Sequence, residues 1–225
     1  MANDQEKEAA ARASLRFIQD GQVVGLGTGS TASYFIKLLG EQVKQGMRIR
    51  GIPTSDRSRE LAISVGIPLT TLDECQEIAV TVDGADEVDP KLRLIKGGGG
   101  AMLREKIVAS ATKLMIVVAD ASKRVERLGK FPLPVEVIQF AQALIAKRIS
   151  ALGAQVNLRT NSDGSPYITD ENNYILDCRF GEIRDAEGLA RQLSEMPGVV
   201  EHGLFIGMAS IALLARGSEI IELRR

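Results

Sequence analysis

The sequence QVVGLGTGST at residues 22–31 decides the fold of the first half of the chain, because it joins an apolar strand, predicted over 22–25, to a helix, predicted over 30–45. Its glycines let the backbone turn tightly with its N–H groups exposed, and the N-terminus of the following helix favours an anion. Threonine and serine hydroxyls add further donors. These features favour a phosphate cradle over a plain strand-to-helix turn. The predicted cradle consists of Thr28, Gly29, Ser30 and Thr31.

The cradle departs from both common nucleotide-binding motifs. Ser30 occupies the position of the third glycine in G-x-G-x-x-G, and no Gly-Lys-Ser/Thr follows as a P-loop requires. A monophosphorylated small molecule is therefore favoured over a dinucleotide or a nucleoside triphosphate.

Outward from the cradle, short apolar strands alternate with helical patterns. Strands spaced by helical crossovers predict an α/β fold with a mostly parallel, Rossmann-like sheet that is covered on both faces and binds ligands at the carboxyl ends of its strands. The predicted strands lie at 22–25, 48–52, 78–82, 93–95 and 114–118, and the predicted helices at 5–19, 30–45, 55–65 and 101–110.

The pattern changes at FPLP, residues 131–134, where two prolines break helix. The following segments predict the order βαββαβ, typical of a smaller, ferredoxin-like α+β domain. They lie at 135–137, 139–151, 154–159, 173–179, 185–196 and 199–205. In the tail, residues 206–225, the sequence predicts an apolar helical run and then a strand at 219–223, which we expect to return to the first sheet. We therefore expect a catalytic domain of residues 1–130 plus 206–225 and a ferredoxin-like domain of residues 131–205.

Charge and hydropathy exclude several classes of protein. The 28 Lys and Arg residues nearly balance 29 Asp and Glu residues, which argues against a broad surface for nucleic acid or anionic membranes. Apolar runs reach only a few residues, far short of the roughly 20 that a membrane span needs. The charged, alanine-rich N-terminus does not read as a secretory signal. We expect a cytoplasmic protein with no nucleic-acid or membrane partner.

The histidine and cysteine content narrows the chemistry. Cys75 and Cys178 fit no C-x-x-C pattern, which argues against a structural zinc site or a disulfide framework. His202 is the single histidine, so neither an HExxH metal site nor a histidine-based triad is expected. We expect no metal, and acid–base work should fall mainly to carboxylates and lysines.

An acidic turn, TVDGADEVDP, follows an apolar strand at residues 81–90. Asp83 and Asp86 lie three residues apart, so a tight turn through Gly84 and Ala85 would point both carboxylates into one cleft. A cation site is the alternative, but the spacing D-x-D-x-D-G of an EF-hand is missing. The expected solvated rim consists of Glu87 and Asp89.

A glycine-rich loop begins LIKGGGGAMLREK at residue 94. Lys96 ends a strand, and four glycines in succession favour close approach of backbone N–H groups to an oxyanion. Glu105 alone would read as an exposed helix carboxylate, but its place after this loop makes it a candidate for the site. Lys123, in VVADASKRV, follows another strand at the same sheet edge. The glycines expected to contact a ligand are Gly97, Gly98 and Gly99.

Taken together and in this order, these segments closely resemble the type A ribose-5-phosphate isomerase family. The resemblance rests on GLGTGST at 25–31, SDRSREL at 55–61, DGADEVDP at 83–90, KGGGGAMLREKIVA at 96–109, ADASKRV at 119–125, GKFPLPVEV at 129–137 and GVVEHGLF at 198–205. It covers nearly the whole chain. A small departure is Leu103, where the family often has threonine, and this change affects packing more than chemistry.

The resemblance implies interconversion of D-ribose 5-phosphate and D-ribulose 5-phosphate in the pentose phosphate pathway, with no metal or organic cofactor. It places the general base on Glu105 and substrate-binding stretches on 28–31, 83–86, 96–99 and Lys123. Family members are usually dimers or tetramers, so a homodimer or homotetramer is expected.

A mechanism compatible with this reaction passes through a cis-enediolate, with Glu105 carrying the proton between C2 and C1. Lys96 and the N–H groups of residues 97–99 would stabilise the enediolate, and Asp83 would pass protons between O1 and O2. We expect Asp86 and Lys123 to open the sugar ring.

Other readings stay open at this point. Lys7, on the first helix, is a further candidate for the phosphate. A sugar-phosphate sensor would need the cradle but no proton shuttle, and a different phosphosugar isomerase or a lactonase would share the cradle.

Overall fold

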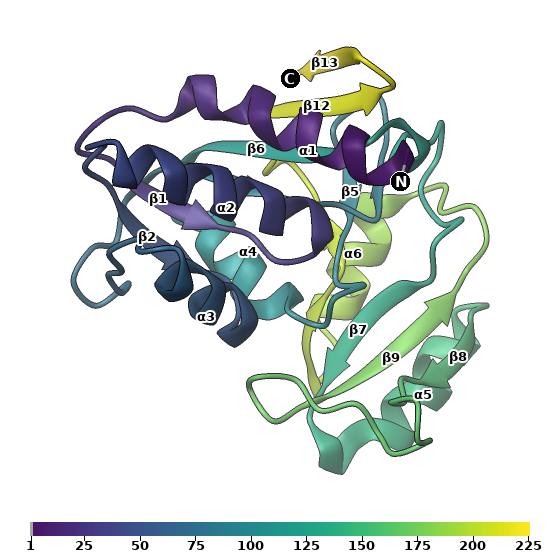
Figure 1. Ribbon diagram of the computed structural model, residues 1–225. Helices are drawn as coiled ribbons and strands as arrows, with labels where there is room; N and C mark the ends of the chain where they lie inside the picture. Colours follow the sequence, from purple (N-terminus) through teal and green to yellow (C-terminus); the bar gives the residue numbers. More distant parts are fainter. Residues whose placement is uncertain (1) are drawn as a thin grey trace.

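In the computed structural model, which describes residues 2–225, the larger sheet has six strands. They are β1 Val23–Leu26, β2 Arg50–Pro53, β3 Ile78–Asp83, β6 Thr112–Asp120, β12 Ile211–Arg216 and β13 Glu219–Arg224. Their order is β13-β12-β6-β3-β1-β2, and each neighbouring pair is parallel except β12 with β13 (Figure 1). The predicted α/β class and the mostly parallel sheet are confirmed.

Helices cover both faces of this sheet, as the alternation of side chains along β6 shows. Ile116 and Val118 face a core shared with the first two helices, whereas Met115 and Val117 face a second core that includes Ala109. The helices are α1 Ala2–Ser14, α2 Ser30–Lys44, α3 Asp56–Ser64 and α4 Met102–Ser110, with short 3-10 turns at η1 Leu15–Phe17 and η2 Ala121–Lys123. α1 and α2 lie over one face and α4 over the other.

The order of the strands creates a crevice. From β1 the chain passes to β2 on one side, and β3 lies on the other side of β1. At such a switch point the loops that follow the strands diverge, and ligands bind outside the carboxyl ends of the strands. The loop after β1 carries the cradle and the loop after β3 carries the acidic turn, so both predicted segments meet at this point.

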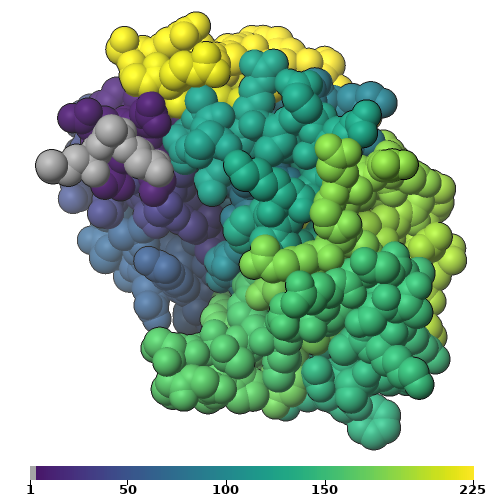
Figure 2. All heavy atoms as spheres, turned by 90° about the vertical axis from the view of Figure 1, so that its right-hand side faces the viewer, coloured from purple at the N-terminus to yellow at the C-terminus, as the bar shows by residue number. Residues whose placement is uncertain are grey.

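The smaller sheet contains β7 Leu133–Val137, β8 Gln155–Leu158, β9 Tyr174–Arg179 and β10 Val199–His202. Its order β10-β7-β9-β8 is antiparallel throughout. The accompanying helices are α5 Gln142–Ala151, which follows the 3-10 turn η3 Gln139–Ala141, and α6 Ala186–Ser194. The predicted βαββαβ order is therefore confirmed. Figure 2 shows these residues, in green, below the yellow C-terminal part of the chain.

A third, three-stranded sheet consists of β4 Glu87–Val88, β5 Leu94–Ile95 and β11 Leu204–Phe205. The strand predicted at 93–95 therefore does not join the parallel sheet. The strand predicted over 199–205 is also divided, at Gly203, between two sheets. Gly203 packs closely against the backbone of Lys96, because a Cβ atom on it would lie 2.3 Å from the carbonyl oxygen of Lys96. The N–H of Gly203 donates to Pro134 O at 2.7 Å.

The tail corrects a prediction. The apolar run after residue 206 was expected to be helical, but residues 211–216 form β12, which pairs with β6 and β13. Five of its six residues are buried, and such a continuous apolar run does not distinguish a strand covered on both faces from a buried helix. No helix within residues 2–225 is long and apolar enough to cross a membrane.

The tail strands join the larger sheet, whereas residues 133–202 build the smaller one. We propose on this basis that the chain has a domain of residues 1–130 plus 206–225 and a second domain of residues 131–205.

Candidate active site

A pocket at the switch point gathers nearly all of the predicted site residues. It is lined by Lys7, Thr28, Gly29, Ser30, Thr31, Gly84, Ala85, Asp86, Lys96, Gly97, Gly98, Gly99, Glu105, Ala119, Asp120 and Lys123. Of the residues predicted from the sequence, only Asp83 is not among these. It is fully buried and contacts Lys96. The structure thus brings together segments from six different places along the chain.

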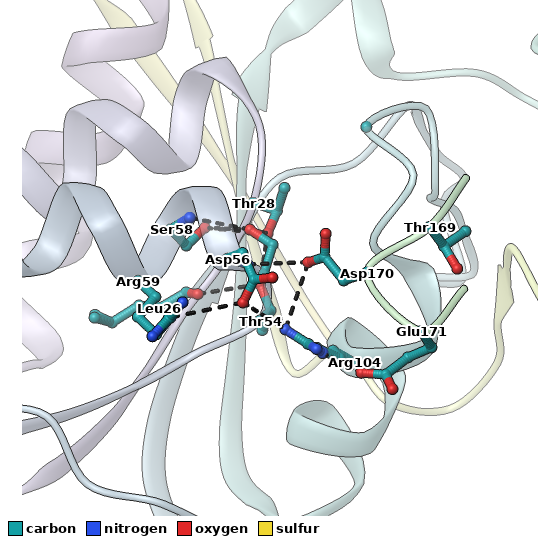
Figure 3. A network of polar contacts seen from close by, with 12 residues as sticks. Leu26, Thr28, Thr54, Asp56, Ser58, Arg59, Arg104, Thr169, Asp170 and Glu171 are labelled. Atoms are coloured by element: carbon teal, nitrogen blue, oxygen red, sulfur yellow. Dashed lines mark hydrogen bonds and ion pairs between the residues drawn. The ribbon is translucent and has the colours of Figure 1, made fainter. Parts of the chain in front are cut away.

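The cradle is tied to α3 through the hydroxyl of Thr28. This oxygen lies 2.8 Å from the hydroxyls of both Thr54 and Ser55 and 3.1 Å from that of Ser58 (Figure 3). Ser58 in turn donates to Gly27 O at 2.7 Å. The hydroxyl of Thr28, expected as a ligand donor, is therefore surrounded by other hydroxyls and holds the loop in place.

The remainder of the cradle is open to a ligand. Gly29 precedes α2 with a φ of 105°, a backbone conformation that residues other than glycine rarely adopt. This conformation lets the chain enter α2 with the first N–H groups of the helix directed outward. Ser30 is exposed and Thr31 is buried at the first turn of α2. The N-terminus of a 15-residue helix therefore faces the pocket and attracts an anion.

Beside the cradle, one buried lysine is shared by two buried carboxylates. Lys96 Nζ lies 3.0 Å from Asp83 Oδ2 and 3.4 Å from Glu105 Oε1, and it donates to Gly84 O at 2.6 Å. All three side chains are at most 5% exposed. Asp83 ends β3, Lys96 follows β5 and Glu105 lies in the first turn of α4, so three separate elements supply the cluster.

Burial controls the electrostatics of this cluster. Desolvation, with repulsion from Asp83, raises the pKa of Glu105 to about 8, although Lys96 opposes the shift. Desolvation likewise raises the pKa of Asp83 against the attraction of Lys96. For Lys96, desolvation lowers the pKa, but the two carboxylates outweigh it and the net shift is upward. A single ammonium therefore only partly offsets two buried acids, and Glu105 is poised for proton transfer near neutral pH.

The glycine loop, residues 97–100, holds the second carboxylate of the acidic turn. Gly98 N–H donates to Asp86 Oδ2 at 2.7 Å. A Cβ atom on Gly98 would lie 2.5 Å from Asp86 Oδ1, so a larger residue would displace this carboxylate. Steric contact with Asp86 therefore requires glycine at position 98, and the sequence pattern alone does not reveal this contact.

Three further residues line the pocket: Ala119 and Asp120, which the sequence analysis did not name, and Lys7, which it named as a candidate for the phosphate. Asp120 is 2% exposed at the end of β6 and accepts a hydrogen bond from Ser122 N at 3.1 Å. Its position just after the end of a predicted strand is the sequence feature that could have identified Asp120 as a site residue. Lys7 reaches the pocket from α1, and its Nζ is 3.9 Å from Asp4 Oδ1. No sequence pattern placed α1 over the crevice.

The expected solvated rim is wrong. Glu87 is 2% exposed and Asp89 is fully buried. The carboxylate of Glu87 accepts the backbone N–H groups of Gly129, at 2.7 Å, and Phe131, and Asp89 pairs with Arg93. These acids were expected to be exposed because acidic residues seldom bury without partners, and the partners come from distant loops and from the turn after Asp89.

Outside the pocket, Arg104 on α4 contacts the loop between β8 and β9 of the smaller sheet. Arg104 Nη1 lies 3.1 Å from Asp56 Oδ1 and 3.5 Å from Asp170 Oδ2, and Nε contacts Glu171 (Figure 3). Asp56 N–H also donates to Asp170 Oδ2 at 2.9 Å. The loop at 169–171 is thereby joined to α3 and α4.

The fold and site define an enzyme of the α/β class that performs acid–base chemistry on a small phosphorylated substrate. The N-terminus of α2, which favours an anion, and the buried carboxylate of Glu105 beside the Lys96 ammonium line the same pocket. Within the described part of the chain, no group of three or more His, Cys, Asp or Glu side chains is arranged to hold a metal ion.

The chain belongs to the ribose 5-phosphate isomerase A family. The model of that family, also named phosphoriboisomerase A, matches residues 50–219. The chain is 53% identical to ribose-5-phosphate isomerase A of Parvibaculum lavamentivorans, over 98% of this chain and 99% of the relative. It is 52% identical to that of Agrobacterium fabrum, over 94% of each.

Solved structures agree. A D-ribose-5-phosphate isomerase in complex with phospho-erythronic acid superposes with a TM-score of 0.97 at 43% identity, covering all of both chains. Ribose 5-phosphate isomerase A from Methanocaldococcus jannaschii gives 0.94 at 40% identity, covering 98% of this chain and 99% of the other.

Proposed function

We propose that Glu105 is the proton carrier in the interconversion of ribose 5-phosphate and ribulose 5-phosphate, the reaction of the family to which this isomerase belongs. The observation that carries the proposal is that the Glu105 carboxylate is buried, lines the pocket and has an oxygen that is unpaired within the described chain. Glu105 is 4% exposed and lines the pocket, and its Oε2 contacts no hydrogen-bond donor among residues 2–225. A buried acceptor left unpaired is energetically costly, so a ligand or a reacting proton is its natural partner.

The reaction moves a carbonyl group from C1 to C2. Glu105 removes the proton from C2 of the aldose, and the electrons of that C–H bond form the C1–C2 double bond of a cis-enediolate. The same carboxylic acid then returns the proton to C1 while the carbonyl forms at C2. A positioned base of this kind contributes about 10²–10⁴-fold to the rate.

The negative charge of the enediolate needs donors in place before the reaction. Lys96 Nζ, within 3.4 Å of Glu105, is one, and the N–H groups of the glycine loop are others. Asp83 passes a proton between the two sugar oxygens. Its support is that Oδ2 pairs with Lys96 Nζ at 3.0 Å, while Oδ1 accepts the N–H groups of Thr28 and Gly84.

The phosphate group occupies the cradle at the N-terminus of α2, with Lys7 and Lys123 nearby as cations. The related isomerase bound to phospho-erythronic acid supports a phosphorylated, sugar-like ligand. Asp86 and Lys123 open the ring of the cyclic substrate as an acid–base pair. Asp86 is held for this task by Gly98 N–H.

The assembly and location are also proposals. We propose a cytoplasmic homodimer or homotetramer. Its support is that Phe140, 99% exposed, and Leu144 and Ile168, each about half exposed, leave apolar surface uncovered on the single chain. Light scattering on the purified protein distinguishes these assemblies from a monomer.

The test is the isosteric substitution Glu105→Gln, which removes the base and keeps the shape. We expect kcat to fall by about 10²–10⁴-fold, with little change in substrate binding measured by calorimetry. The matched control is Glu60→Gln on the exposed face of α3, which should retain wild-type kinetics.

A Glu105→Gln enzyme that folds normally and keeps kcat within tenfold of wild type would remove Glu105 from the proton-transfer role. Loss of activity in both variants would instead point to a general effect of the substitutions.

A further inference from the structure

Arg159 reaches from the smaller sheet to the glycine loop. It follows β8, and its side chain is 14% exposed. Nη1 donates to the carbonyl oxygens of Gly97, at 2.8 Å, and Gly98, at 3.2 Å. These are contacts to main-chain atoms of the pocket wall, 61 and 62 positions away in the sequence. Arg159 does not itself line the pocket.

The guanidinium is held rigidly in this position. Its Nε donates to Asp177 Oδ2 at 3.0 Å, and Nη2 pairs with Asp177 Oδ1, which makes a two-point ion pair with β9. Tyr167 lies alongside, with its ring centroid 6.0 Å from the guanidinium and its N–H donating to Arg159 O at 2.9 Å. The Tyr167 hydroxyl also donates to Gly99 O at 3.4 Å. A built platform therefore backs the glycine loop.

The contacts of Arg159 with the two carbonyls, together with the hydrogen bond from Gly100 N–H to Gly97 O at 3.0 Å, fix where the neighbouring N–H groups point. In a trans peptide unit, the C=O of one residue and the N–H of the next point in opposite directions. With Gly97 C=O directed at Arg159, Gly98 N–H points away from it and donates to Asp86. With Gly98 C=O also directed at Arg159, the N–H of Gly99 points away from the guanidinium, and Gly99 lines the pocket.

We propose that Arg159 is a positioning residue of the isomerase: it orients the peptide groups of the glycine loop so that Gly98 N–H holds Asp86 and Gly99 N–H faces the reacting oxygens. This inference rests on the proposed roles of the loop and of Asp86. Donors contribute most to an oxyanion when they are oriented in advance, and glycines lack side chains that could restrain their own peptide planes.

The experiment compares Arg159→Ala, Arg159→Lys and the control Arg179→Ala, which removes an exposed arginine from the end of β9 in the same sheet. We expect kcat of Arg159→Ala to fall by about 10- to 100-fold, less than the loss of a direct oxyanion donor. KM should change by less than about threefold, because the cradle lies on other elements. Arg159→Lys keeps a point charge without the fork, so it should recover part of kcat.

Two readouts separate orientation from a purely structural role. Millimolar guanidinium chloride should restore part of the activity of Arg159→Ala but not alter Arg179→Ala. In the ligand-free protein, the amide hydrogens of Gly98 and Gly99 should exchange faster in Arg159→Ala than in wild type, as measured by NMR. The amide exchange measurement does not depend on catalytic activity. It therefore tests the orientation of the loop even in a variant whose activity is too low to measure.

The proposal is overturned if folded Arg159→Ala keeps kcat within twofold of wild type. It is equally overturned if the Gly98 and Gly99 amides exchange at wild-type rates, or if guanidinium and lysine both fail to recover any activity. Failure of the proposed function would look different, because Glu105→Gln would then remain active while the amide exchange still responded to Arg159.

Discussion

At the scale of single residues, the site depends on one ammonium group shared by two buried acids. Lys96 is 2% exposed, and its neighbours Asp83 and Glu105 both have raised pKa values because desolvation outweighs its attraction. Such groups titrate as a cluster, so an observed pKa belongs to the three side chains together. This arrangement lowers stability but favours proton transfer, since a carboxylate fully paired with a cation would have a low pKa and be a weak base.

The first residue-scale prediction concerns pH. Glu105 acts as a base only when ionised, and its pKa is raised to about 8. We expect kcat/KM to increase with pH and to level off above about 8. A profile that is flat from pH 5 to 9, measured with a pH-insensitive assay, would contradict the assignment.

The same shift has a consequence for stability. Because the folded pKa of Glu105 is raised above its ordinary value of 4.5, the folded state holds the proton more tightly than the unfolded state. The contribution of this group to stability is complete below pH 4.5 and is lost as the pH rises through about 8. Unfolding midpoints of wild type should therefore fall relative to Glu105→Gln across this window.

A second prediction concerns Lys96→Met. Removing the ammonium leaves two buried carboxylates facing each other, and losing one partner of a buried pair costs about 3–5 kcal/mol of unfolding free energy. The loss should be largest at pH 8 and smaller at pH 5, where the acids take up protons. Denaturant unfolding measures it, with the exposed Lys91→Met as the control. An equal loss at both pH values would argue against the cluster.

At the scale of elements, the two ends of the pocket are built by different means. The cradle depends on a turn and a helix end that are consecutive in sequence, and α3 stabilises it from outside through the hydroxyls around Thr28. Ser55 also caps α3 by accepting from Ser58 N–H at 3.0 Å. The start of one helix therefore supports the loop that precedes another.

The element-scale prediction is Ser58→Ala. It removes the hydrogen bond to Gly27 O and one neighbour of Thr28, which should cost about 1 kcal/mol. If this loss weakens the binding of the substrate phosphate by the same free energy, KM should rise about fivefold while kcat stays nearly unchanged. Ser64→Ala, at the exposed end of the same helix, is the control. A fall in kcat with KM unchanged would show that Ser58 acts on the chemical step instead.

At the scale of the whole molecule, the three-stranded sheet joins two hydrophobic cores. Leu204 packs with Ile95 in the core of the smaller sheet, whereas the next residue, Phe205, packs in a core beneath the larger sheet. Phe205 also contacts two cations, because Lys96 Nζ lies 5.5 Å and Lys106 Nζ 4.9 Å from its ring centroid. One member of the buried cluster, Lys96, thus directly follows a strand of the sheet that connects the two cores.

The whole-molecule prediction is that both sheets unfold together. Leu204→Ala should destabilise the protein by about 2–5 kcal/mol while circular dichroism and tyrosine fluorescence still report one transition. Leu144→Ala, at a half-exposed position on α5, should have a small effect. Two separate transitions, of which Leu204→Ala shifts only one, would show that the sheets fold independently.

Much of the fold follows from local patterns. The helix at 30–45 and the βαββαβ order were predictable because caps, glycine turns and apolar periodicity act over a few residues. The strand β12 was not, because a fully buried strand and a buried helix share the same apolar composition. The prediction for Glu87 was wrong because its partners, the N–H groups of Gly129 and Phe131, lie far along the chain. The prediction for Asp89 was wrong because Lys91 N–H and Arg93, in the turn that follows it, satisfy the buried carboxylate.

The amino-acid sequence by itself determined the α/β class, the cradle, the glycine loop and the candidate base Glu105, because each depends on neighbouring residues. Only the tertiary structure decided that Lys96 lies between Asp83 and Glu105, that Lys7 enters the pocket and that Arg159 backs the glycine loop. These contacts join separate elements through burial and hydrogen bonding, and no local pattern encodes which distant partner a buried charge will meet.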